Sequence, residues 1–297
     1  MATLTLDRSS ENTASPQYRP DRHRTSRAIK KTVLYIVLGI ASALILLPFA
    51  WMVLSSLKHN NQVFSVPIQW LPDPVVWQNY VDIWAKSDMT TWIKNTLILS
   101  VTVTLLQVVT GSFAAYGFSK VRFPGRDVLF LAYVGTLAVP WQAYMVPQFM
   151  ILAKAGLANT LWSIIALQAF NAFGVFLMKQ YYESIPEDLS EAARIDGLSE
   201  YSIWWRIIVP LSGPAVATLT LLVFTITWND YLGPLIYLRD HSIWTIQIGL
   251  QSFVTQYNAE YALIMTGSVL SVVPIAAIFL AGQRYFVQGI ASTGLKG

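Results

Sequence analysis

The sequence predicts an all-α polytopic membrane protein with six transmembrane helices, and three observations lead to this fold class. Of the 297 residues, 54% are hydrophobic and only 12% are charged, whereas soluble domains carry about 25% charged residues. A soluble protein of this composition would leave apolar surface uncovered. Six apolar stretches reach the roughly 20 residues that cross a bilayer, and polar turns separate them. They cover residues 32–57, 93–118, 128–151, 160–181, 211–235 and 262–286.

The chain before the first apolar stretch is polar and rich in Ser, Thr, Pro and Arg. Because it lacks a hydrophobic face, we predict a disordered cytoplasmic tail over residues 1–30 and a six-helix transmembrane domain over residues 31–297. The first apolar stretch is too long for the hydrophobic part of a signal peptide and lacks a convincing cleavage site. It is therefore predicted to be an uncleaved membrane helix.

The distribution of Lys and Arg predicts the orientation of these helices. With the N-terminus inside, 15 of the 20 Lys and Arg residues fall on the inner side and five on the outer side. This agrees with the preference of cytoplasmic loops for positive charge. Both termini and the segment over residues 183–210 are therefore expected in the cytoplasm.

Two segments are expected on the outer side. Residues 58–91 are rich in Trp and Pro, which fits either aromatic anchoring at the membrane interface or a short helix at the mouth of a pathway. Residues 239–261 form either a loop or a short helix that faces an extracellular partner.

The cytoplasmic segment over residues 183–210 carries six of the sixteen Asp and Glu residues of the chain. Pro186 suits the start of a helix, and the acids at positions 187 and 188 suit its first turn. Gly197 suits a left-handed exit at the end of that helix. Ser199 can cap a second short helix that ends near Pro210. The segment is predicted to be a helix–glycine–helix elbow, either an interfacial hairpin without a partner or a contact site for a soluble protein.

The elbow also carries a spaced pattern of residues. It consists of Glu191, Ala192, Ala193, Gly197, Ile207 and Pro210. The pattern resembles the EAA signature of permeases of binding-protein-dependent ABC importers: Glu-Ala-Ala, three residues, Gly, nine residues, Ile, any residue, Leu-Pro. Val209 stands in place of the Leu, a conservative departure. Residues 228–234 and 283–289 also resemble that family, particularly the second, six-helix permease of maltose-like sugar importers, and the similarity covers about residues 30–297.

The resemblance implies a type I ABC importer permease, half of the translocation pathway for a carbohydrate or related polyol. The elbow would be the coupling helix, seated in a cleft of a separate ATPase, which binds ATP and Mg while this chain binds no cofactor. The implied partners are a second permease in a heterodimer, two ATPase subunits, an extracytoplasmic substrate-binding protein and membrane lipid. The implied location is the inner membrane of a bacterium or the plasma membrane of an archaeon. The implied coupling residues are Glu191, Ala192, Ala193, Asp196, Gly197, Ile207 and Pro210.

Polar and aromatic residues within the predicted spans are candidates for the substrate path, because such groups face a bundle interior rather than lipid. Each also has a structural alternative: a cap at a helix end, an interfacial anchor, a bond to a neighbouring helix, or, after Pro140, a break in the third span. The candidates are Gln107, Trp141, Gln142, Asn171, Trp228, Asn229 and Asp230.

Several functions find no support in the sequence. It contains no Gly-x-x-x-x-Gly-Lys-Ser/Thr phosphate loop, so we do not expect this chain to hydrolyse ATP by that route. Cysteine is absent and the three histidines are scattered, which excludes thiolate sites and gives no metal-binding spacing. No nucleophile–base pair indicates an enzyme, and the basic residues next to the first span suit lipid better than nucleic acid. The alternatives are an ion-gradient-driven secondary transporter, which Asp230 as the only acid within a span disfavours, and a membrane scaffold.

Overall fold

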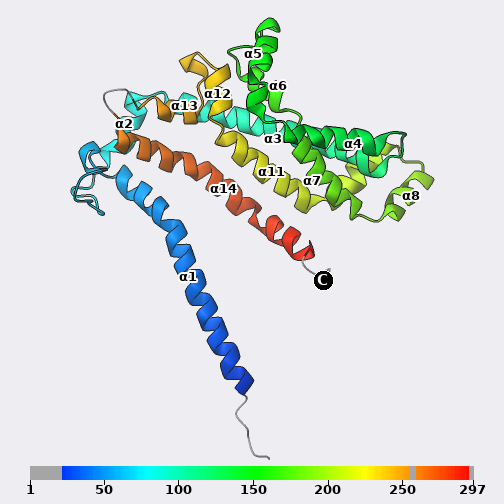
Figure 1. Cartoon of the computed structure of the whole chain (residues 1–297), viewed down its shortest axis with the longest axis horizontal. Coiled ribbons are helices and arrows are strands. Elements are labelled where there is room, and N and C mark those ends of the chain that lie inside the picture. Colours follow the sequence, from blue (N-terminus) through cyan, green and yellow to red (C-terminus); the bar gives the residue numbers. More distant parts are fainter. Residues whose placement is uncertain (1–21, 255–258, 294–297) are drawn as a thin grey trace, which may run out of the picture. The chain divides into compact units, whose positions relative to one another are not determined.

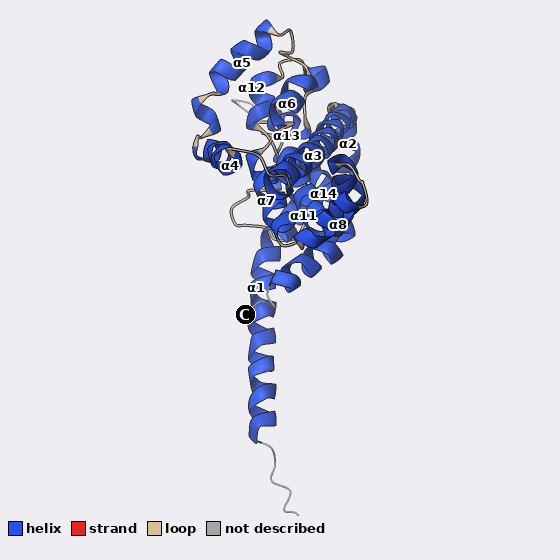
Figure 2. Cartoon of the chain, turned by 90° about the vertical axis from the view of Figure 1, so that its right-hand side faces the viewer, coloured by secondary structure: helices blue, strands red, loops and turns tan. Residues whose placement is uncertain are grey.

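The computed structural model describes residues 22–254 and 259–293, and within them the chain forms helices and loops, with one isolated bridge between Val254 and Ala259 (Figure 2). The helical content agrees with the predicted fold class. Residues 1–21 of the predicted tail lie outside the described residues, and the first helix begins at Arg22. The α-helices are α1 (Arg22–Ser56), α2 (Gln78–Lys86), α3 (Met89–Lys120), α4 (Arg126–Gly135), α5 (Met145–Lys154), α6 (Leu161–Gln168), α7 (Ala172–Glu183), α8 (Glu187–Ile195), α9 (Glu200–Ile203), α10 (Val209–Leu211), α11 (Gly213–Trp228), α12 (Leu232–Tyr237), α13 (Ile246–Gln251) and α14 (Tyr261–Thr293).

The chain divides into two compact units, residues 1–50 and 51–297. The first unit contains most of α1, whose 28-residue stretch Ile29–Ser56 is apolar and long enough to cross a membrane. The second unit contains every other helix of the described chain.

Four helical stretches of the described chain are single candidate membrane spans. They are Ile29–Ser56, Met89–Lys120, Leu161–Glu183 and Tyr261–Gln283, which correspond to the first, second, fourth and sixth predicted stretches. A fifth candidate is the pair Glu200–Leu211 and Gly213–Trp228, which is bent by 82°. Only α11 of this pair overlaps the predicted fifth stretch substantially, because the first member belongs to the charged elbow.

The third predicted stretch, residues 128–151, is not one continuous helix. It contains α4 and α5, separated by two short 3₁₀ turns, Thr136–Ala138 and Trp141–Ala143. Val139 and Pro140 have ψ angles of 114° and 134°, which are extended values. The break has a local cause, since Pro140 has no backbone N–H to donate and also disfavours a helical conformation of the preceding residue.

Helix α3 is the centre of the second unit and packs most extensively against α7 and α11. Figure 1 shows α11 between α3 and α14. Small residues allow the close approach of α3 and α7: a Cβ added to Gly111 would lie 3.5 Å from the backbone carbonyl carbon of Gly174. Trp228 is fully buried, and its Nε1 donates to the backbone oxygen of Ser271 at 3.1 Å, which joins α11 to α14. Small interfacial residues and interhelical hydrogen bonds are the usual means of holding membrane helices together.

The two segments predicted on the outer side, residues 58–91 and 239–261, contribute to a second, smaller core. Its buried side chains come from α2, α13, α14 and the first turn of α3, and include Ile83, Trp92 and Leu263. Asn95 of α3 donates to the backbone oxygens of Ser242 and Trp244, each at 3.0 Å. Short helices are therefore present in both segments that the sequence predicted on the outer side, and for each of them a short helix was one of two alternatives.

Candidate functional site

The elbow begins with a helix whose ends match its charges. Pro186 precedes α8, Glu187 and Asp188 occupy its first turn, and Arg194 occupies its last turn. Acids near the N-terminus and a base near the C-terminus complement the helix dipole. The nine-residue helix is therefore locally favoured by its own sequence.

Gly197 ends α8 in a left-handed conformation, with a φ of 82°. The N–H of Leu198 donates to Ala193 O and the N–H of Gly197 donates to Arg194 O, both at 3.0 Å. This pair of bonds is the Schellman arrangement, in which glycine is preferred because it has no Cβ to clash. The glycine exit expected from the sequence is thus present in the structure.

The second arm of the elbow is more irregular than the sequence predicted. Ser199 caps α9, its Oγ accepting from the N–H of Ser202 at 3.4 Å. A π-helical turn, Trp204–Ile208, follows, and α10 then includes Pro210 and continues to Leu211. The bend into α11 falls at Ser212, just after the predicted end.

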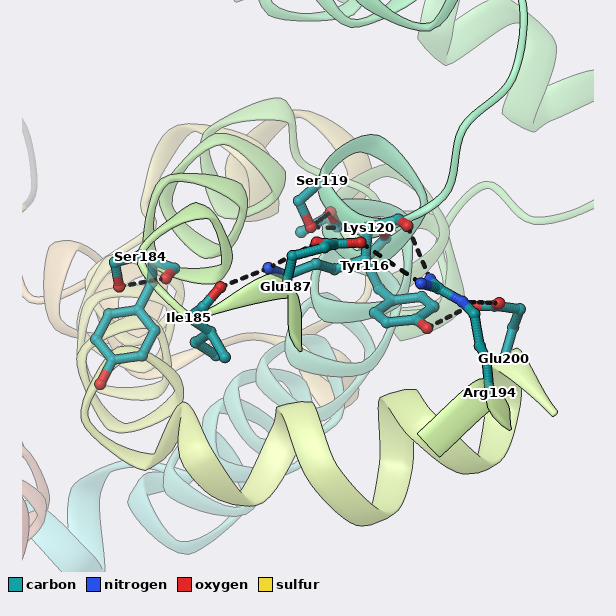
Figure 3. A network of polar contacts seen from close by, with 10 residues as sticks. Tyr116, Ser119, Lys120, Ser184, Ile185, Glu187, Arg194 and Glu200 are labelled. Atoms are coloured by element: carbon teal, nitrogen blue, oxygen red, sulfur yellow. Dashed lines mark hydrogen bonds and ion pairs between the residues drawn. The ribbon is translucent and has the colours of Figure 1, made fainter. Parts of the chain in front are cut away.

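Two bonds from Lys120, at the end of α3, hold the start of α8. Its side chain is only 4% exposed. The Nζ donates to the backbone oxygen of Ile185 at 2.7 Å and lies 3.3 Å from Glu187 Oε2 (Figure 3). This buried ammonium therefore has a carbonyl and a carboxylate as partners, as a buried charge requires.

Arg194 joins the two arms of the elbow to the same end of α3. Its Nε donates to Glu200 Oε1 at 2.8 Å, and its Nη2 donates to the backbone oxygen of Lys120 at 3.0 Å. The hydroxyl of Tyr116 donates to Glu200 Oε2 (Figure 3). Because Arg194 lies in the last turn of α8 and Glu200 begins α9, this network fixes the angle of the elbow and attaches it to α3.

The electrostatic consequence is mutual stabilisation of the two charges. The Arg194 guanidinium is the main cause that holds the pKa of Glu200 below its ordinary value, and the hydrogen bond to Glu200 raises the pKa of Arg194. Both groups therefore keep their charges at neutral pH. The carboxylate is 43% exposed, so solvent screening limits the strength of the pair.

One face of α8 has no covering in the described structure. The positions follow the i, i+3, i+4, i+7 spacing of a helix face, and all four are exposed: Asp188, Glu191, Ala192 and Ile195. Ile195 is 86% exposed, an unusual position for a large apolar side chain at the end of an otherwise charged helix.

The residues of the predicted coupling pattern differ in how exposed they are. Glu191, Ala192 and Asp196 are exposed, while Ala193 is 6% exposed and belongs to the main core. Gly197 forms the turn, Ile207 is half-buried and Pro210 is exposed. Sequence reasoning missed the polar network, whose members are Tyr116, Lys120, Glu187, Arg194 and Glu200.

A second feature is a cavity of about 830 Å³ whose lining residues all belong to the second unit. Residues from three interruptions of the helices line it: Val139 and Trp141 between α4 and α5, Phe170 and Asn171 between α6 and α7, and Asp230 between α11 and α12. Backbone without helical hydrogen bonds is tolerated at membrane depth only against protein or a water-filled space. Discontinuous membrane helices also commonly build the substrate sites of transporters.

Asp230 is the centre of a polar cluster in this cavity. Its Oδ2 accepts from Gln168 Nε2 at 2.9 Å and its Oδ1 accepts from the N–H of Gly233 at 3.1 Å. The Nε2 of Gln107 donates to the backbone oxygen of Gln168 at 2.7 Å. The carboxylate is thus held in place by two donors from two different helices.

Aromatic residues form another part of the wall. Gln148 Oε1 accepts from Trp141 Nε1 at 3.0 Å and lies 3.2 Å from the hydroxyl of Tyr237. The rings of Trp141 and Tyr237 are 6.3 Å apart with an interplanar angle of 65°. The wall therefore combines fixed aromatic faces with amide groups.

Four of the predicted path residues line this cavity, namely Gln107, Trp141, Asn171 and Asp230. Three do not. Gln142 is exposed in the 3₁₀ turn, Trp228 is buried against α14, and Asn229 bonds to Thr225 O at 2.8 Å at the end of α11. Gln148 and Gln168 were missed, although they show the same signal as Gln107, an uncharged amide within a predicted span; Tyr237 had no such signal.

The chain was then compared with known proteins. Residues 107–292 match the family described as "Binding-protein-dependent transport system inner membrane component". The arabinooligosaccharides transport system permease protein AraQ of Halalkalibacterium halodurans is 31% identical over 277 residues, covering 92% of this chain and 99% of that protein. The lactose transport system permease protein LacG of Rhizobium radiobacter is 33% identical over 264 residues, covering 89% and 96%.

A solved structure has a similar fold. It is a chain of a bacterial ABC transporter involved in the import of the acidic polysaccharide alginate, with a TM-score of 0.77 and 27% sequence identity. The similarity covers 90% of this chain and all of that chain.

Proposed function

Because the chain belongs to the family of inner membrane components of binding-protein-dependent transport systems, we propose that it is the permease of an ATP-driven importer for a carbohydrate or related polyol. Its relatives carry arabinooligosaccharides and lactose, and its structural neighbour belongs to an importer of an acidic polysaccharide. ATP hydrolysis then takes place on a separate subunit, and this chain contributes no catalytic residue. It binds no cofactor, since ATP and Mg belong to the ATPase.

The proposed arrangement has six spans, with both termini and the elbow in the cytoplasm of a bacterial or archaeal cell. The spans are α1, α3, the broken pair α4 and α5, the pair α6 and α7, α11 and α14. The chain forms half of a heterodimeric pore with a second permease. Two ATPase subunits bind on the cytoplasmic side and a substrate-binding protein on the outer side.

The exposed face of α8 is the observation that best supports an ATP-driven importer. One side of the elbow is bonded to α3 through Lys120 and Arg194, while the other presents Glu191, Ala192 and Ile195. A helix that drives the pore must contact the ATPase on one side and the membrane helices on the other. The reason is that a partner shifts a conformational equilibrium only through contacts that differ between the two states. We assign α8 as the coupling helix and its exposed face as the contact with the ATPase.

Reconstitution tests the function as a whole. The assembled complex in proteoliposomes, supplied with its binding protein and a panel of sugars, should accumulate a sugar only with ATP, and vanadate should stop uptake. Uptake that follows a proton or sodium gradient and ignores vanadate would establish the secondary transporter instead.

A pair of variants tests the elbow. Ile195→Glu should weaken copurification of the ATPase roughly tenfold, because it replaces the one large apolar side chain of the exposed face with a charge. Leu189→Glu is the matched control, since Leu189 is also exposed, at 44%, but lies on the flank of α8. Equal retention of the ATPase by both variants would show that this face is not the contact.

A further inference from the structure

The charge of the cavity between the broken helices indicates which class of substrate the cavity admits. This inference rests on the proposed transport function. Among the described residues that line the cavity, Asp230 is the only carboxylate, and no Lys, Arg or His is present. The volume, about 830 Å³, lies within the range of about 300–1,000 Å³ that is typical of small-molecule sites. This half of the pathway therefore presents negative charge and no compensating cation.

The position of Asp230 is fixed by its surroundings. A Cβ added to Gly233 would lie 2.6 Å from Asp230 Oδ2, so the carboxylate packs directly against the backbone of α12. The N–H of Gly233 and Nε2 of Gln168 hold its two oxygens. A carboxylate oxygen accepts more than one hydrogen bond, so each can still accept from a ligand hydroxyl.

Donor and acceptor groups beside it are available to a polar, uncharged ligand. Gln148 uses its Oε1 for Trp141 and Tyr237, and its Nε2 has no partner among the described residues. Gln107 uses its Nε2 for Gln168 O, and its Oε1 likewise has no partner in the described part of the chain. A sugar hydroxyl both donates and accepts, so it can bond to a free amide N–H and to a fixed carboxylate.

The aromatic wall suits the rest of a sugar ring. Trp141 and Tyr237 are held at their polar ends by Gln148, and Phe170 is 70% exposed at the break between α6 and α7. A pyranose ring has an apolar C–H face, which an aromatic face can cover while the ring hydroxyls reach polar neighbours. An anionic sugar meets the same wall but is repelled by Asp230.

We infer that this cavity admits neutral polyhydroxylated sugars and excludes anionic ones such as uronates, with Asp230 as the residue that determines this selectivity. Similarity to known proteins does not decide between the two classes, because the similar proteins belong to transport systems for neutral and for acidic carbohydrates. The local charge does decide, because an anion in a cavity with low-dielectric walls is screened less than in water.

The absence of cysteine allows a direct test in the assembled complex. A single cysteine at Leu137, which lines the cavity, would be labelled with a cationic trimethylammonium-ethyl and an anionic sulfonato-ethyl methanethiosulfonate. After correction for their rates with a free thiol, the cationic reagent should react roughly three- to fivefold faster if the charge lies about 10 Å away. The same complex without the new cysteine measures background labelling.

Asp230→Asn in the Leu137→Cys background should bring the corrected ratio close to one, since asparagine keeps the shape and can still accept from Gly233. Asp240→Asn is the matched control, because Asp240 does not line the cavity, and it should leave the ratio unchanged. A ratio of one or below in the parent, or no effect of Asp230→Asn, would overturn the inference. So would lactobionate slowing the labelling more than lactose does. Because ATP-dependent uptake is measured separately, such a result would leave the transport function standing.

Discussion

Variants of Gly197 distinguish a requirement for its left-handed backbone conformation from a requirement for a small residue at the ATPase contact. Its φ is 82°, and a Cβ added to it would meet no other atom within 4 Å. Alanine therefore introduces no clash, and the whole cost is that of a left-handed conformation, about 1–2 kcal/mol for an L-residue with a Cβ. That corresponds to roughly a 5- to 30-fold change in the population of the native elbow.

Hydrogen exchange in the assembled complex measures this change where it occurs. The amides of Gly197 and Leu198, which bond to Arg194 and Ala193, report opening of the turn. In Gly197→Ala they should exchange roughly 5- to 30-fold faster, and in Gly197→Val faster still. Gly197→Asn should stay closer to the native protein, because asparagine tolerates the left-handed region better than other residues with a Cβ.

The order of the three variants decides the interpretation. A backbone effect ranks them Asn, Ala, Val from mildest to most severe, whereas a requirement for a small surface ranks Ala mildest. If Gly197→Ala exchanges at the native rate, or if Gly197→Asn is as damaging as Gly197→Val, the conformational argument is refuted. ATP-dependent uptake by the same variants then shows how closely transport follows the turn.

Three further predictions follow from the packing and charge of the second unit. Glu200→Gln should destabilise the elbow by about 0.5–1 kcal/mol at pH 7, a small value because the carboxylate is 43% exposed. Since Arg194 lowers the pKa of Glu200, this stabilisation is complete above the ordinary carboxylate pKa of about 4.3 and disappears as the pH falls through the lowered value. Thermal unfolding of the two proteins at several pH values should therefore differ at pH 7 and converge in acid; a difference that stays the same at every pH would contradict this assignment. Gly111→Leu should separate α3 from α7 and prevent stable assembly, whereas Gly111→Ala, whose Cβ lies 3.5 Å from Gly174, should assemble normally on size-exclusion chromatography. Trp228→Phe removes the hydrogen bond to Ser271 and should cost about 1 kcal/mol in thermal unfolding, with the order of preference among transported sugars unchanged; an altered order would return Trp228 to the substrate path.

Local chemistry is the part of the fold that the sequence predicts well. Apolar runs locate all four single candidate spans of the described chain, because a helix that crosses hydrocarbon must itself be apolar over its whole length. The turn at Gly197 and the break at Pro140 can also be predicted from the sequence, because a left-handed exit and a helix break follow from the covalent structure of glycine and proline. What the hydropathy of residues 128–151 conceals is the extent of the break, because apolar composition does not distinguish a continuous helix from two half-helices around a cavity.

The elbow shows the same division between local and long-range information. Its charges are visible in the sequence as an anomaly between two apolar spans, and its helices follow from caps and dipole effects within a few residues. The partners of those charges are not visible, because Arg194 bonds to Lys120 O across 74 positions and Tyr116 bonds to Glu200 across 84. Ala192 is exposed and Ala193 is buried, and this difference also depends on where α8 meets the core.

The sequence by itself determined the all-α class, the positions of the main apolar helices, the turn at Gly197 and the resemblance to a transport family, since each depends on composition or on short spacing along the chain. Only the tertiary structure decided which polar residues meet in one cavity, that Trp228 is buried against α14, and that Asp230 is the only carboxylate in the described lining. The physical reason is that selectivity depends on the sum of charges and hydrogen-bonding groups around one space. Those groups come from helices far apart in the chain and are brought together only by packing.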